Sequence, residues 1–195
     1  MLKLDNLSKK YNNQIILNSI SLEFKEGNLY ILSGINGSGK STLVKLLSGI
    51  IFKSSGSITR DISISYLPDK FTMPKLLSVK SYCKLLSIPI ELMEKYQIPN
   101  KRIGELSKGN LQKLGIIQIL NNKSDCYILD EPLDGLDDAA KKLLKQDIIT
   151  LKGNNKIIIM CLHTKTLFNE LCPIEYEVKG GFLNEKRRRK AKDSD

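Results

Sequence analysis

Residues 34–41 form a segment whose composition suits the binding of a phosphate chain. They read Gly-Ile-Asn-Gly-Ser-Gly-Lys-Ser and match the pattern G-x-x-x-x-G-K-[ST]. Glycines let the backbone curl so that its N–H groups point inward at phosphate oxygens, and a following helix adds the positive end of its dipole. Lys40 supplies a full charge near the β- and γ-phosphates, and Ser41 offers a hydroxyl to Mg²⁺. The alternative is a glycine-rich turn with a stray lysine. The residues predicted to contact the nucleotide here are Gly34, Asn36, Gly37, Ser38, Gly39, Lys40, Ser41 and Thr42.

Two acidic residues follow an apolar run that reads as a buried strand. The run at residues 126–130 ends in Asp130, and Glu131 comes next. Ligands of open α/β sheets bind at the carboxyl ends of the strands, so Asp130 is expected to help hold the metal ion. A carboxylate in the place of Glu131 can orient or deprotonate an attacking water. The alternative is a polar strand end without a chemical role.

The elements that must position these residues alternate between strands and helices. Apolar or alternating runs predict strands at residues 2–4, 15–24 (broken near Asn18), 29–32, 58–67, 126–130 and 157–161. Helical spacing predicts helices at about 41–49, 110–121, 138–151 and 166–171. Residues 70–106 carry a helical face that three prolines, Pro74, Pro89 and Pro99, cut into short pieces. The alternation of β and α elements predicts an α/β domain with a mostly parallel sheet.

The composition of the 195 residues excludes several classes of protein. Hydrophobic residues make up 41% and charged residues 27%, which excludes disorder for the bulk of the chain. Four cysteines without a CxxC pair indicate a reducing compartment, and a single histidine, His163, excludes a His-rich metal site. No signal peptide or membrane-spanning run is recognisable, so we expect a cytoplasmic chain without a transmembrane segment of its own.

The charge of the chain is strongly basic. Thirty-one basic and 21 acidic residues give a net charge of +10. Such an excess is compatible with nucleic acid, anionic lipid or a polyphosphate ligand, but the basic residues are scattered. They cluster only at residues 186–190, which reads as a solvated tail or as a lipid or RNA contact.

Further motifs in the same order show a resemblance to the ATP-binding cassette (ABC) ATPases over residues 1 to about 185. The run Leu106-Ser107-Lys108-Gly109-Asn110 is similar to the family signature LSGGQ, and residues 126–132 resemble the family Walker B motif. Residues 133–137 resemble the D-loop. His163 follows an apolar strand in the place of the switch histidine, and Tyr11 falls where the family keeps an aromatic residue that stacks on adenine. The resemblance implies a P-loop NTPase core with a mostly parallel sheet, an N-terminal antiparallel β part and a short inserted helical lobe at about 70–106.

The resemblance also implies a division of labour between two chains. In the family, two domains face head to tail and bind two ATP molecules at their interface. Lys40, Glu131 and His163 would be the catalytic residues, and Ser41 and Asp130 the metal ligands, of the ATP bound to the same chain. Ser107 and Gly109 would contact the γ-phosphate of the partner's ATP, and Asp134 would bridge the two sites. The alternatives are that His163 is simply a polar residue at a strand end and that Tyr11 is a packing or turn residue.

The chain departs from the family pattern at three points. Asp69 stands where the family usually has Gln, so direct Mg²⁺ ligation by this third metal candidate can give way to a contact through water. Lys108 and Asn110 replace the usual Gly and Gln, and an LSKG core resembles exporters that pair with separate membrane subunits. The segment from Asp69 to Leu106 is shorter than the family norm, which predicts a reduced helical lobe.

The resulting interpretation is the ATPase subunit of an ABC transporter, with residues 1–185 as the ATPase domain and 186–195 as a basic tail. It would use ATP and Mg²⁺, pair with a second ABC ATPase subunit (homodimer or heterodimer) and drive a separate transmembrane subunit, in an exporter, from the inner face of the cell membrane. A nucleic-acid partner is not expected, although a soluble ABC ATPase acting on nucleic acid or in regulation remains the alternative. A non-hydrolysing structural subunit is disfavoured by Glu131.

Overall fold

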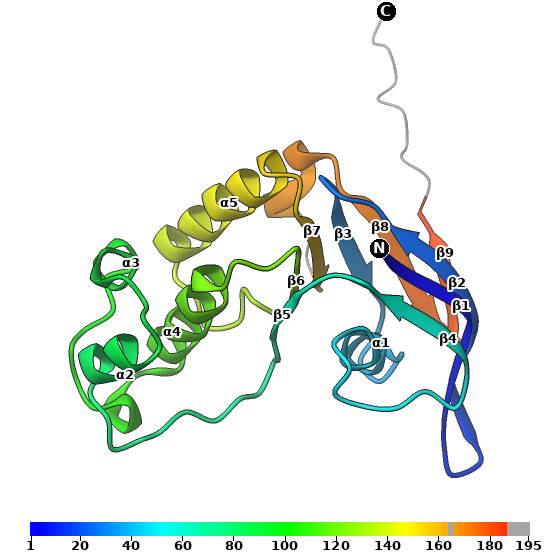
Figure 1. Cartoon of the computed structure of the whole chain (residues 1–195), viewed down its shortest axis with the longest axis horizontal. Coiled ribbons are helices and arrows are strands. Elements are labelled where there is room, and N and C mark those ends of the chain that lie inside the picture. Colours follow the sequence, from blue (N-terminus) through cyan, green and yellow to red (C-terminus); the bar gives the residue numbers. More distant parts are fainter. Residues whose placement is uncertain (164–165, 187–195) are drawn as a thin grey trace, which may run out of the picture.

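Within residues 1–163 and 166–186, which the computed structural model describes, three of the six runs predicted as strands lie entirely in one six-stranded sheet. Its strands are β3 (Leu29–Ser33), β5 (Ile64–Leu67), β6 (Cys126–Asp130), β7 (Ile157–Cys161), β8 (Ile174–Lys179) and β9 (Phe182–Glu185). Their order is β5–β6–β7–β3–β8–β9 (Figure 1). Neighbours are parallel except β8 and β9, which form an antiparallel hairpin. The predicted α/β fold with a mostly parallel sheet is confirmed.

A second, antiparallel sheet of the described chain confirms the predicted N-terminal β part. It contains β1 (Leu2–Tyr11), β2 (Gln14–Phe24) and β4 (Ser55–Arg60) in the order β2–β1–β4. Strand β1 is longer than the predicted strand at 2–4 because its polar second half pairs with both neighbours. The expected break near Asn18 corresponds to shifts in the β1–β2 register and to a positive φ of 49° at Ser19.

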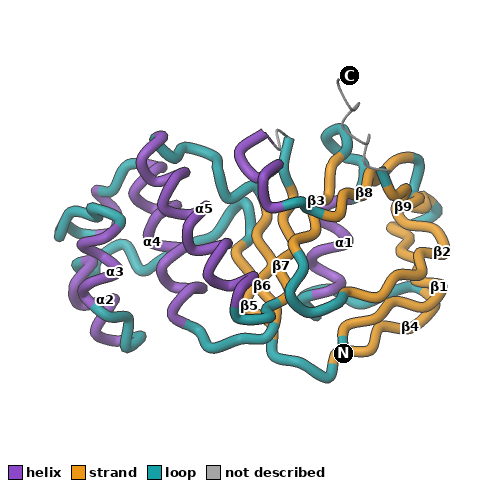
Figure 2. Tube along the Cα trace, turned by 90° about the horizontal axis from the view of Figure 1, so that it is seen from above, coloured by secondary structure: helices purple, strands orange, loops and turns teal. Residues whose placement is uncertain are grey.

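Helices cover both faces of the six-stranded sheet. Helix α1 (Lys40–Leu47) packs between the two sheets, and α4 (Lys108–Asn121) and α5 (Asp138–Gly153) pack on the opposite face (Figure 2). Side chains alternate along β6, so that Cys126 and Ile128 join the core around α1 while Tyr127 and Leu129 join the core of α4 and α5. A strand buried on both faces reads as a continuous apolar run, which is why β6 and β7 were predicted correctly.

The short elements of residues 70–106 lie together beside α4 (Figure 1). They are α2 (Val79–Leu85), α3 (Ile90–Lys95) and the 3₁₀ helix η1 (Ile103–Glu105). Ser78 begins α2 by accepting a hydrogen bond from the Ser81 N–H at 3.1 Å, and Pro89 precedes α3. The predicted short helical lobe is therefore present. None of the described helices combines the length and apolar composition needed to cross a bilayer.

The prediction of one strand at residues 58–67 is wrong, because the two ends of this segment belong to different sheets. The chain leaves the antiparallel sheet after Arg60 and enters the parallel sheet at Ile64. The Asp125 carboxylate accepts hydrogen bonds from the backbone N–H and hydroxyl of Ser63, at 3.1 and 2.7 Å. These contacts hold the connection beside β6, and a pattern of alternating residues cannot reveal such a change of partner strand.

The C-terminal part completes the parallel sheet. Residues predicted as helical at 166–171 form a 3₁₀ helix, η2 (Thr166–Leu171). No element was predicted for 174–185, where β8 and β9 form their hairpin around two glycines, Gly180 and Gly181, of positive φ. The basic cluster predicted as a tail lies outside the described residues from position 187 onward.

Candidate nucleotide-binding site

The segment after β3 curls around the ammonium group of Lys40. This lysine is the first residue of α1 and is 6% exposed. Its Nζ donates hydrogen bonds to the carbonyl oxygens of Gly34 and Ile35, at 2.8 and 3.3 Å. The charge is thereby held inside the loop, where an anion bound by the loop's N–H groups would meet it. The strand–loop–helix order that the sequence predicted for residues 29–49 is present.

Gly34 has a position that no other residue could occupy without strain. Its φ is +145°, and a Cβ atom would lie 2.5 Å from the carbonyl oxygen of Val178 on β8 and 2.7 Å from Ser38 Oγ. The loop is thus packed directly on the neighbouring strand. Ser38 Oγ is buried and makes no hydrogen bond within the described residues, so it can form a hydrogen bond with a bound ligand.

A pocket of about 460 Å³ opens in front of this loop and brings most of the predicted residues together. Most of the residues that form it follow β3, β5, β6 and β7, so the site lies at the carboxyl ends of these strands, and Tyr11 and Ile16 reach it from β1 and β2. Ile16 on β2 was not predicted, because an apolar strand residue carries no sign that it faces a pocket. The lining residues are Tyr11, Ile16, Asn36, Gly37, Gly39, Lys40, Ser41, Thr42, Asp69, Glu131, Asp134 and His163.

Asp130 provides a buried oxygen that fits a metal ion. It ends β6 and is 1% exposed, and its Oδ1 makes no hydrogen bond within the described residues. A buried carboxylate oxygen without a partner is costly unless a cation or donor satisfies it. The Ser41 hydroxyl and the Asp69 carboxylate add oxygens at the pocket wall, and Mg²⁺ prefers oxygen ligands. The residues present therefore fit Mg²⁺ shared with phosphate oxygens and water. Among the described residues there is no group of three or more His, Cys, Asp or Glu side chains that could hold a metal ion.

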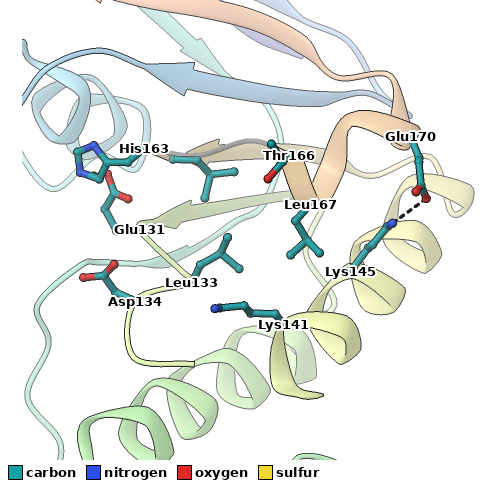
Figure 3. A pocket seen from close by; sticks show the side chains of 10 residues that line it. Glu131, Leu133, Asp134, Lys141, Lys145, His163, Thr166, Leu167 and Glu170 are labelled. Atoms are coloured by element: carbon teal, nitrogen blue, oxygen red, sulfur yellow. Dashed lines mark hydrogen bonds and ion pairs between the residues drawn. The ribbon is translucent and has the colours of Figure 1, made fainter. Parts of the chain in front are cut away.

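Glu131 and His163 face each other at the edge of the pocket (Figure 3). His163 Nε2 lies 3.2 Å from Glu131 Oε1, and the Glu131 side chain is 15% exposed. Glu131 has a φ of +50°, and its N–H donates to the carbonyl of Cys161 at 3.1 Å. Burial raises the pKa of the Glu131 carboxyl above its usual range, while the His163 and Lys40 side chains oppose the rise. A carboxylate held in this way is a stronger base than an exposed one.

A second pocket, of about 600 Å³, adjoins the first between α5 and η2 (Figure 3). The two pockets share Glu131, Asp134 and His163, which therefore form the boundary between them. Lys145 Nζ and Glu170 Oε2 form an ion pair at 2.7 Å on the far wall. The other lining residues are Leu133, Lys141, Leu162, Thr166 and Leu167.

Ser107 and Gly109 do not line the pocket around Lys40. Ser107 begins α4, and its Oγ accepts a hydrogen bond from the Asn110 N–H at 3.2 Å. At Gly109 a Cβ atom would lie 2.4 Å from the Gly135 carbonyl oxygen, so only glycine allows this approach. The structure therefore separates these two predicted phosphate contacts from the rest of the site within one chain.

Two ion pairs join the start of α4 to the segment after Glu131. The Lys108–Asp134 ion pair has a length of 3.3 Å and is exposed on both sides. The Lys113 side chain is 9% exposed, and its ammonium pairs at 2.7 Å with the half-exposed carboxylate of Asp137. These pairs could not be predicted from the sequence, because lysines on a helix are usually solvated.

Comparison with known proteins identifies the family. The ABC transporter family profile matches residues 17–134, more than half of the chain. This chain belongs to the ABC transporter ATPase family. It binds ATP and hydrolyses it to ADP and phosphate, and subunits of this kind dimerise and work with transmembrane partners.

Individual relatives differ in the transport they serve. An uncharacterised ABC transporter ATP-binding protein of Methanocaldococcus jannaschii is 34% identical over 88% of this chain and 71% of its own length. The lantibiotic transport ATP-binding protein SrtF of Streptococcus pyogenes is 33% identical over 84% of this chain and 80% of its own. The zinc import ATP-binding protein ZnuC of Rickettsia bellii is 31% identical over 83% of this chain and 75% of its own.

The fold is also that of a solved cassette. A dimeric post-hydrolysis structure of an ATP-binding cassette bound to ADP and Pi superposes with a TM-score of 0.82 at 21% identity. It covers 98% of this chain and 100% of the other.

Proposed function

We propose that this chain is the ATP-hydrolysing subunit of an ABC exporter, working on a separate transmembrane subunit at the cytoplasmic face of the cell membrane. The observation that carries the proposal is the convergence of Lys40, Glu131 and His163 on one pocket. They follow β3, β6 and β7, which are neighbours in the sheet. A phosphate clamp, a buried carboxylate and an imidazole at one site are the groups that hydrolysis of a phosphoanhydride requires.

In this proposal the loop at residues 34–41 binds the triphosphate. Backbone N–H groups and the Lys40 ammonium hold the β- and γ-phosphates, while Tyr11 and Ile16 border the base. Ser41 and Asp130 would hold Mg²⁺, with Asp69 contributing directly or through a water. When bound, the ion supplies positive charge against the phosphate oxygens.

Glu131 acts on the attacking water. Its carboxylate accepts a proton from the water as the water oxygen bonds to the γ-phosphorus and the bond to the ADP oxygen breaks. His163, 3.2 Å from Glu131, holds the carboxylate in place and can donate to a γ-phosphate oxygen. The raised pKa of Glu131 makes the carboxylate a better proton acceptor at neutral pH.

A second ATPase subunit, identical or homologous, completes the site. Ser107 and Gly109 lie outside the pocket of their own chain, at the exposed start of α4. In a head-to-tail pair they would contact the γ-phosphate held by the partner. The contacts between α4 and the segment from Asp134 to Asp137 would link the two sites mechanically.

The helical lobe is the proposed docking surface for the transmembrane subunit. Of the apolar residues that follow Asp69, Met73 is buried and Phe71 and Leu77 pack against the core, whereas Leu76 is 85% exposed. These apolar side chains are thus partly used for packing within the lobe. Further exposed apolar side chains of the lobe are Leu85, Leu86 and Ile90.

Export is supported by the LSKG core and by the similarity to a cytochrome c biogenesis ATP-binding export protein. Similarity to a zinc import protein is almost as high, so the direction rests on the signature sequence. We assign the ATPase to residues 1–185 and propose the basic residues 186–195 as an appended tail.

Two measurements on the purified chain test this function. Mg²⁺-dependent release of phosphate from ATP, together with co-purification of a multi-span membrane protein from detergent extract, is the expected result. Affinity for RNA or DNA that falls steeply with salt, without a membrane partner, would replace the transporter by the nucleic-acid alternative. Binding of ATP without phosphate release in the presence of the membrane partner would indicate a structural subunit instead.

A further inference from the structure

The ammonium group of Lys9 lies over one face of the Tyr11 ring. The distance from Nζ to the ring centroid is 4.6 Å, and the same Nζ donates a hydrogen bond to the Phe52 carbonyl oxygen at 2.8 Å. Lys9 and Tyr11 are two positions apart on β1, so their side chains leave the same face of the strand. A cation above an aromatic face is attracted by the ring quadrupole. Lys9 therefore bridges the Tyr11 ring and the Phe52 carbonyl of the segment that joins α1 to β4.

That joining segment is itself fixed along the end of β1. The backbone N–H of Ser54 donates to the Ser8 carbonyl at 2.9 Å, and Ser54 Oγ accepts from the Lys10 N–H at 2.9 Å. The Phe52 carbonyl oxygen thus has a defined place, and it gives the Lys9 ammonium a second anchor. With only one partner the position of the ammonium group would be less fixed, because the four-carbon stem of lysine is flexible.

The other face of the Tyr11 ring is the one left for a ligand. Tyr11 is 46% exposed and lines the nucleotide pocket together with Ile16 and the loop around Lys40. With Lys9 on one face, a planar group entering the pocket can stack only on the opposite face. A nearby cation also draws electron density from the ring, which favours stacking with an electron-rich purine.

We propose that Lys9 is a positioning residue for the purine base of the bound nucleotide, acting through Tyr11. This role rests on the proposed function, in which the base stacks on Tyr11. Lys9 contacts the ring and the Phe52 carbonyl rather than the nucleotide. Its contribution depends on the base, whereas the charge of Lys40 acts on the phosphates.

The test compares ATP with inorganic tripolyphosphate as ligands in titration calorimetry with Mg²⁺. Lys9→Gln keeps a polar hydrogen-bond donor but has no charge, and Lys9→Arg keeps the cation. We expect Lys9→Gln to weaken ATP binding about two- to five-fold, to leave tripolyphosphate binding unchanged, and to raise KM without changing kcat. Lys9→Arg should bind ATP like the wild type. Lys10→Gln is the control, because it removes the same charge from the next residue, whose ammonium makes no ring contact or ion pair within the described residues.

Tyr11→Ala separates failure of this role from failure of the base site. Loss of base stacking should weaken ATP binding about 5- to 150-fold. If Tyr11→Ala binds ATP normally, the base does not stack there, and both the base site and the role of Lys9 are refuted. If Tyr11→Ala weakens ATP binding but Lys9→Gln does not, only the role of Lys9 is overturned. Equal losses for ATP and tripolyphosphate in Lys9→Gln would overturn it too, since they would indicate a general effect of charge.

Discussion

Replacing Glu131 by glutamine tests the chemistry of the pocket with little change in shape. The carboxylate is partly buried, lies 3.2 Å from His163 Nε2 and has a raised pKa. Glutamine keeps the contact to His163 but cannot accept the proton of water. Loss of a positioned base slows a reaction by about 10²- to 10⁴-fold, which corresponds to about 2.7–5.4 kcal/mol in the barrier. ATP binding should persist, because Lys40 and the backbone of its loop are untouched.

The pH dependence gives the same test a second readout. Burial is the largest cause of the raised Glu131 pKa, and the carboxylates of Asp130 and Asp134 add to it, against His163 and Lys40. The base works only when deprotonated, so wild-type hydrolysis should fall as the pH drops through a value above 4.5. In Glu131→Gln this acidic limb should vanish.

Stability should change in the direction opposite to activity. A carboxyl whose pKa is raised by folding stabilises the fold below its unfolded pKa, and this contribution is lost as pH rises through the folded pKa. At pH 7 the Glu131 carboxylate therefore costs stability, and Glu131→Gln should unfold at the same temperature as the wild type or higher.

The assay is phosphate release from ATP over a pH series, with size-exclusion chromatography in the presence of ATP. Glu131→Gln should elute as a dimer in ATP, since the γ-phosphate is retained. The matched control is Glu170→Gln, in which the lost charge belongs to an 80% exposed side chain on the far wall of the second pocket. It should hydrolyse ATP at the wild-type rate. Full activity of Glu131→Gln, or a monomer in ATP, would refute the assignment of the base.

Three further substitutions probe binding, stability and docking. Lys40→Ala removes the charge held inside the loop, so nucleotide titration and phosphate release should show weak ATP binding and no turnover; normal values would refute the phosphate site. Asp137→Ala removes the cap of α5 and the ion-pair partner of Lys113, whose side chain is 9% exposed, so thermal unfolding should show a loss of about 2 kcal/mol, or about 4–8 °C in Tm. The control Asp138→Ala, at a 92% exposed side chain, should change Tm by less than about 2 °C. Equal Tm values for the two variants would contradict the stabilising role of the cap and of the Lys113–Asp137 pair. Leu76→Asp should leave ATP hydrolysis unchanged and reduce capture of the membrane subunit in a pull-down, and wild-type capture would exclude this surface from docking.

The predictable part of this molecule is the part encoded by local pattern. Strands buried on both faces, such as β6 and β7, are recognisable in the sequence as apolar runs. The loop around Lys40 is recognisable because its glycines and lysine have a fixed spacing. The fold confirms both. The split of residues 58–67 between two sheets was missed, since it depends on hydrogen bonds from Ser63 to Asp125, 62 positions away.

In the candidate site, too, some residues could be predicted from the sequence and others could not. Tyr11, Asp69 and His163 were named from their places relative to motifs, and the fold brings them to one pocket with Lys40. Ile16 and Lys9 were not named, because an apolar residue and a lysine on an exposed hairpin have no distinctive type or spacing. Their positions matter only once β1, β2 and the loop before β4 lie side by side.

Ser107 and Gly109 lie outside the pocket around Lys40 in their own chain, so their proposed phosphate contacts require a second chain. Gly109 packs on the Gly135 carbonyl, and Lys113 pairs with Asp137, so the start of α4 and the segment after Glu131 are joined. Because Asp134, in that segment, also lines the pocket around Lys40, a ligand that moves the segment would move Ser107 and Gly109 with it. In the proposed pair, phosphate bound in one chain would thereby be coupled to the surface that the chain offers its partner. Cooperative hydrolysis between two subunits would follow from these contacts rather than from any further domain.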